Sequence, residues 1–153
     1  AQRREHDTWQ RPDCLAGVLT LACRFLGPNE HVPALEALIA PFGGGWLTIF
    51  DGLANYGPAD YFLGVLAALR SDFVEADRLL RRAIRACDAE GALLFGTLAR
   101  IDLAAILTTH DASNEVDGEA AALLGTAREA IQRAGIERLT DLDSWNVLVE
   151  SSG

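Results

Sequence analysis

One stretch near the middle of the chain, ending at Gly91, constrains the fold most, because it contains two different helical patterns in succession. Residues 61–69 are apolar nearly all round a helix, which is typical of a helix buried on most sides. Residues 73–90 place apolar side chains at spacings of three and four, with charged side chains on the other face. The break at 70–72 separates the two patterns. Together they predict an antiparallel helical hairpin that begins at 57–58, where proline suits a first helical turn.

The same pattern recurs on both sides of this hairpin. The tripeptide Gly-Val-Leu at 17–19 is found again at 64–66, and residues 119–135 repeat the apolar spacing of 75–91. We therefore expect a hairpin with helices at about 12–26 and 32–40, and another with helices at about 92–109 and 119–134. A last helix is expected at about 141–150. Its acidic start, at Asp141 and Asp143, suits the helix dipole.

Two segments fall outside this pattern. Residues 1–11 are polar and of mixed charge, which is typical of a linker remnant. Residues 41–45 contain three consecutive glycines, which disfavour a helix by about 1 kcal/mol each relative to alanine. The apolar segment 46–56 is compatible with a short strand, with a loop or with a helical turn, and the sequence leaves these three alternatives open.

The central hairpin resembles a tetratricopeptide (TPR) unit. The features that carry this resemblance are Leu63-Gly64 in the first helix and the small residues Ala76 and Ala83 in the second, at the spacing of that repeat. The aromatic residues usual elsewhere in the repeat are absent. The resemblance implies an all-α fold, a TPR-like stack of antiparallel helical hairpins (an α-solenoid). The helix at 141–150 would be its C-terminal cap, since stacked repeats need a polar outer face.

A wider resemblance covers about residues 10–136. The chain is similar to the C-terminal helical-repeat region of large bacterial ATP-dependent LuxR-type (MalT-like) transcriptional regulators and of ATPase-coupled adenylyl cyclases. The segments that carry it are GPAD at 57–60, LGVLA at 63–67, FVEA at 73–76, GA at 91–92 and RIDLA at 100–104. It implies a sensor or protein-interaction module, with residues 12–150 as one domain of a longer cytoplasmic protein. The absence of methionine agrees with a fragment.

Composition and motifs argue against several other functions. A formal net charge of −9 disfavours contact with nucleic acid, whose phosphates carry the same sign. No apolar run is long enough to span a membrane. The chain has no phosphate-binding loop, no metal-ligand spacing among its three histidines, and no catalytic motif. We therefore expect no enzyme activity, no cofactor and no metal. The glycines at 43–45 are interpreted as a turn, and the arginines at 78–85 as a solvated helix face.

The concave side of the stack is the candidate binding site. In a TPR-like arrangement the first helix of each hairpin lines that side, and the repeat pattern assigns six residues to it: Cys14, Val18, Tyr61, Val65, Leu98 and Asp102. Such a mostly apolar groove could hold a peptide, hold a small effector or pack on the rest of the parent protein. The alternative is that these residues are ordinary core.

Two functions follow as expectations. The first is a non-enzymatic interaction or sensor module of a bacterial LuxR-type regulator, whose partner is another domain of the regulator or a separate protein. The second is an inducer-binding domain that uses the groove for a small molecule. A groove filled by its own side chains would favour the first function, and an open pocket of several hundred Å³ would favour the second.

Overall fold

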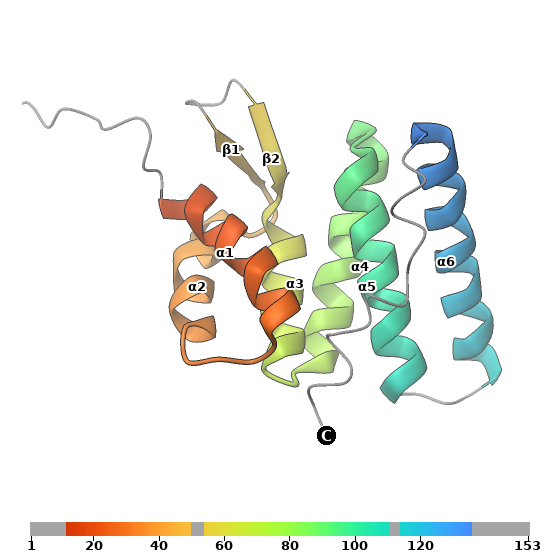
Figure 1. Cartoon of the computed structure of the whole chain (residues 1–153), viewed down its shortest axis with the longest axis horizontal. Helices are drawn as coiled ribbons and strands as arrows, with labels where there is room; N and C mark the ends of the chain where they lie inside the picture. Colours follow the sequence, from red (N-terminus) through yellow and green to blue (C-terminus); the bar gives the residue numbers. More distant parts are fainter. Residues whose placement is uncertain (1–11, 50–53, 111–113, 136–153) are drawn as a thin grey trace, which may run out of the picture.

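The computed structural model describes residues 12–49, 54–110 and 114–135. Within them the chain is mostly helical, with one small antiparallel sheet (Figure 1). The predicted linker at 1–11 and the predicted capping helix at 141–150 lie outside the described residues. The elements are α1 (Pro12–Leu26), α2 (Val32–Ile39), a 3₁₀ turn η1 (Ala40–Phe42), β1 (Trp46–Ile49), β2 (Ala54–Pro58), α3 (Ala59–Leu69), α4 (Phe73–Glu90), α5 (Leu93–His110) and α6 (Asn114–Ala134).

Helices α1 and α2 form the expected N-terminal pair. Helix α1 ends at Gly27, which has a positive φ of 82° and donates its N–H to the Cys23 carbonyl over 2.8 Å. Glycine adopts this conformation without strain, so the chain can turn sharply here. Helix α2 carries proline in its first turn, as predicted, and continues into η1.

The ambiguous segment at 46–56 forms most of a two-stranded antiparallel hairpin, in which Trp46 pairs with Pro58. The helix therefore begins at Ala59, one or two residues after its predicted start at 57–58. Gly57 and Pro58 end β2, and Pro58 has an extended backbone (φ −69°, ψ 132°). The reason is the pairing itself, since the N–H of the next residue, Ala59, bonds to the Gly45 carbonyl at 2.9 Å.

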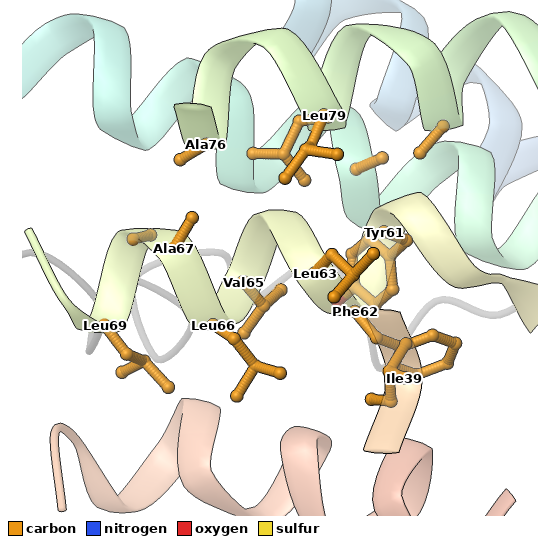
Figure 2. Close-up of a cluster of buried hydrophobic side chains, with 14 of the residues drawn as sticks. Ile39, Tyr61, Phe62, Leu63, Val65, Leu66, Ala67, Leu69, Ala76 and Leu79 are labelled. Carbon is orange, nitrogen blue, oxygen red and sulfur yellow. The ribbon is translucent and has the colours of Figure 1, made fainter. Parts of the chain in front are cut away.

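The central hairpin agrees closely with its prediction. Every residue of α3 is buried. The turn to α4 places Ser71 at a positive φ of 61°, and the Asp72 carboxylate caps α4 by accepting the Glu75 N–H at 3.2 Å. Gly91 ends α4 in the left-handed conformation. Figure 2 shows α3 between α4 on one side and α1 on the other, with Leu66 pointing away from α4.

Helices α5 and α6 form the third pair. Helix α6 begins at Asn114, five residues before its predicted start at Glu119, because residues 114–118 belong to the helix instead of forming a loop. Two of them, Glu115 and Asp117, are acidic, which suits the positive end of a helix dipole. Consecutive helices pack side by side from α3 to α6, and α3 also contacts α1, α2 and α5 (Figure 1). Helix α3 is therefore the centre of the core.

Candidate functional site

The structure closes the predicted groove. Tyr61 and Val65 have no exposed surface, Leu98 is 6% exposed and Asp102 is 1% exposed. These four residues are core, so the expectation that they line an open concave surface is wrong. The pattern nevertheless placed two of them correctly relative to each other, since the Tyr61 hydroxyl donates to Asp102 Oδ2 over 3.1 Å.

The side chain of Arg24, from α1, lies on the side of the helices where the repeat pattern predicted a binding groove. Its guanidinium is fully buried and forms a bidentate ion pair with the Asp102 carboxylate of α5. Arg24 Nε lies 2.9 Å from Oδ1 and 3.1 Å from Oδ2, and Nη2 also donates to Oδ1. Arg24 is not among the six residues predicted from the repeat pattern. The available signal was a single arginine within the apolar run 15–26 of α1.

Burial and charge together fix the protonation of this cluster. Burial alone would lower the pKa of Arg24, but the attraction of Asp102 outweighs it and raises that pKa above its usual range. Burial, reinforced by the Asp102 carboxylate, raises the pKa of Tyr61 well above the ordinary value of 10. Tyr61 is therefore a neutral donor and Arg24 a cation. The cluster joins α1, α3 and α5, and its sealed position suits a structural role rather than ligand contact.

The other two predicted groove residues lie on α1. Cys14 is partly buried, and its thiol donates to the Thr48 carbonyl of β1 at 2.7 Å. Val18 is half exposed. Of the six predicted residues, Val18 therefore has the most open side chain, and it belongs to a larger surface.

That surface is an apolar stripe along the outer side of α1. Its members recur at helical spacings of three and four, so they share one face. The α1 stripe consists of Leu15, Val18, Leu19, Ala22, Phe25 and Leu26, all exposed. Leu26, at its end, is 80% exposed, and the five large side chains include most of the exposed large hydrophobics of the described residues. A contiguous exposed apolar surface of this kind marks an interaction site in soluble proteins.

A separate pocket of about 480 Å³ lies between the β-hairpin and the start of α5. Its wall is partly aromatic. Tyr56 and Phe95 meet edge to face with ring centroids 5.9 Å apart, and Gly57 gives Phe95 room because a Cβ there would lie 2.8 Å from its ring. The lining residues are Leu21, Trp46, Asn55, Tyr56, Gly57, Glu90, Ala92, Leu93, Leu94 and Phe95.

The glycine turn and the arginine face are explained by local contacts. The Gly44 N–H donates to Asp60 Oδ1 at 2.9 Å, and Asp60 in turn pairs with Arg82 at 3.1 Å. Arg78 pairs with Glu75, and Arg81 bridges Asp77 and Glu119. Arg78, Arg81 and Arg82 of the arginine-rich face of α4 thus have acidic partners.

Two searches of the structure give negative results. Among residues 12–49, 54–110 and 114–135, no group of three histidine, cysteine or acidic side chains is placed to hold a metal ion. In the same part of the chain, no helix combines the length and the apolar character that crossing a membrane requires.

Comparison of the chain with known protein families, with curated proteins and with solved structures gives no match.

Proposed function

We propose that this chain is a non-enzymatic protein-interaction module of a bacterial ATP-dependent LuxR-type regulator and acts in the cytoplasm. In this proposal its helical pairs are units of a TPR-like solenoid. The observation that carries the proposal is the α1 stripe, an uncharged helix face that has no covering element within the described residues.

The internal repeat supports this function. Val65 and Leu66 of α3 correspond to Val18 and Leu19 of α1 in the repeated tripeptide. The α3 residues have no exposed surface, because helices pack on both sides of α3, whereas Val18 and Leu19 are 50% and 44% exposed. Helix α1 therefore has the composition of a helix packed on two sides, but among the described residues other elements pack only on its inner side. A protein partner that presents an apolar helix would complete the packing.

The closed groove also favours this function over ligand binding at the predicted position. Arg24 and Asp102 occupy that position and pair with each other, so a small molecule would have to break a buried ion pair to enter. Breaking such a pair costs several kcal/mol. An interaction through the outer face of α1 carries no such cost.

The test measures binding of the remaining domains of the regulator to wild type and to Leu19→Glu by calorimetry. A carboxylate at the centre of the stripe should weaken binding at least about tenfold, because desolvating an unpaired charge in an apolar contact is unfavourable. The matched control is Val74→Glu, which changes an 85% exposed apolar residue on α4. Equal affinity of wild type and Leu19→Glu would exclude the α1 stripe as the binding surface.

A second candidate function is binding of a small effector in the aromatic-walled pocket. Its volume, about 480 Å³, lies within the range of small-molecule sites, roughly 300–1,000 Å³. The test is ligand-observed NMR with a panel of small aromatic compounds on wild type and on Leu94→Trp. The added ring should fill the pocket and abolish binding. The control is Val74→Trp, and compounds that bind all three proteins equally would exclude this pocket.

A further inference from the structure

We infer that the partner of the α1 stripe is a second copy of this chain, bound through an antiparallel contact between α1 and the same helix of the partner. This inference rests on the proposed function, because it names the partner of the same surface. It follows from the charge, the shape and the position of the stripe.

Charge limits where two copies can approach. The chain carries a net charge of −9, so two copies repel each other over most of their surfaces. Helix α1 contains only two charged residues, Asp13 in its first turn and Arg24. Arg24 is buried against Asp102, so the α1 stripe itself carries no charge. Two acidic copies can meet there without bringing like charges together.

The order of residues along the stripe is self-complementary. With a two-fold axis midway between Leu19 and Ala22, Leu19 faces the partner's Ala22, and Leu15 faces the partner's Leu26. A small residue opposite a large one near the axis allows two helices to pack at about 8–10 Å. The contact is isologous, so each copy uses the same residues and the assembly closes as a dimer.

Helix α6, at the opposite end of the described residues, does not offer an equivalent surface. The outer face of α6 exposes small and polar side chains, which are Ala121, Ala122, Thr126, Arg128, Glu129 and Gln132. A head-to-tail contact of α1 on α6 would bury these polar groups without partners, and it would leave a free α1 stripe at the end of each array. The antiparallel contact of two α1 helices buries apolar side chains on both sides.

The size of the stripe sets the expected affinity. A standard interface buries about 800 Å² per partner, contributed by roughly 20–30 residues. The six residues of the stripe form only the centre of such a contact, so the dimer should be weak, with a dissociation constant on the order of 10 µM. Added salt should strengthen it, because salt screens the repulsion between the two acidic copies.

The experiment is sedimentation equilibrium of the 153-residue chain between about 1 and 500 µM, a range that brackets this affinity. The average mass should rise with concentration from 16.4 kDa toward twice that value. Leu19→Glu should raise the dissociation constant at least tenfold, whereas the control Val74→Glu should leave it within about twofold. Circular dichroism of each variant verifies that the fold is retained. We expect the fold to tolerate these substitutions, because Leu19 is 44% exposed and Val74 is 85% exposed.

A mixing experiment tests the antiparallel geometry. Leu19→Arg and Ala22→Glu should each weaken self-association, because like charges then lie near the two-fold axis. Mixed in equal amounts they should form a heterodimer tighter than either homodimer, since the arginine introduced into one variant faces the glutamate introduced into the other. Failure of the mixture to associate more tightly would overturn the antiparallel arrangement.

Two further results would overturn the inference. One is a wild-type chain that stays monomeric up to the highest concentration. The other is a dimer that Leu19→Glu and Phe25→Glu both leave intact. If the chain is monomeric but Leu19→Glu still abolishes binding to the regulator's other domains, the second-copy inference fails and the proposed function stands.

Discussion

At the scale of single residues, the buried ion pair between Arg24 of α1 and Asp102 of α5 links the N-terminal part of the fold to the third helical pair. It joins residues that are 78 positions apart in the chain. A buried ion pair adds little net stability when complete, because both ions lose their hydration, but loss of one partner leaves an uncompensated buried charge.

The first prediction follows from this asymmetry. Asp102→Leu should lower the free energy of unfolding by roughly 3–5 kcal/mol, because Arg24 stays buried without its partner. Adding Arg24→Met to this variant should restore most of the lost free energy of unfolding, since no buried charge remains. Urea denaturation of the wild type and of both variants measures the effect. If the two substitutions lower the stability additively, the two residues do not act as a pair.

The second prediction concerns alkaline pH. The pKa of Tyr61 is raised well above 10 in the folded protein by burial and by Asp102. The folded state therefore holds the Tyr61 proton more tightly than the unfolded state. Its stabilising contribution is complete below the unfolded pKa of about 10 and is lost as pH rises from there toward the folded pKa. The free energy of unfolding should accordingly fall above about pH 10.

Tyr61→Phe provides the comparison for this second prediction. Cys87 contributes to the same alkaline decline, because burial raises the pKa of its thiol to about 11. The phenylalanine variant removes only the Tyr61 part, so its stability should decline less steeply above pH 10 in urea titrations at successive pH values. Parallel pH curves for wild type and Tyr61→Phe would show that Tyr61 ionises equally in both states.

At the scale of elements, the close approach of α3 and α4 depends on small residues. A Cβ at Gly64 would lie 2.9 Å from Leu80 Cγ, and Ala76 has no exposed surface. Figure 2 shows Ala76 of α4 and Ala67 of α3 pointing toward each other. Gly64 and Ala76 are two of the small residues by which the central hairpin resembles a TPR unit.

The third prediction tests this crossing. Ala76→Leu should lower the free energy of unfolding by roughly 1–3 kcal/mol, because the added atoms overpack the contact. Gly125→Ala is the control in α6, where a Cβ would meet nothing within 4 Å. It should raise stability by up to about 1 kcal/mol, because alanine favours a helix over glycine. Thermal melts should shift in opposite directions, and an unchanged midpoint for Ala76→Leu would contradict the packing.

At the scale of the whole molecule, α1 and α5 depend on each other although a hairpin separates them. Tyr61 of α3, Arg24 and Asp102 meet at one point, so disturbing this point should loosen elements far apart in sequence. By contrast, Arg78 pairs with Glu75 within one helix and is half exposed.

The fourth prediction uses this contrast. Arg24→Met should reduce hydrogen-exchange protection in both α1 and α5, because the Asp102 charge is then buried without its ion-pair partner. Arg78→Met should leave protection in both helices unchanged, since an exposed ion pair adds little to stability. Exchange measured by mass spectrometry on peptides from the two helices gives the result. Loss confined to α1 would show that the contact does not couple them.

The sequence by itself determined the helices, the turn at 70–72 and the close crossing at Gly64. Apolar spacing, glycine conformation and side-chain caps act over a few residues, so they are readable locally. The β-hairpin was left open because 46–56 is short and apolar without a clear period. The start of α6 was misplaced because polar residues can extend a helix.

Only the tertiary structure showed that most of the candidate site is buried. The repeat pattern identified residues that face a common side, including Tyr61 and Asp102, but it could not show that Arg24 reaches across to fill that side. Burial depends on what packs over a residue. Here the covering helix is α1, and its Arg24 lies 78 positions before Asp102 in the chain. For the same reason the exposed face of α1 became visible only when its neighbours were placed: its sequence is that of a helix covered on two sides, and the described residues cover its inner side.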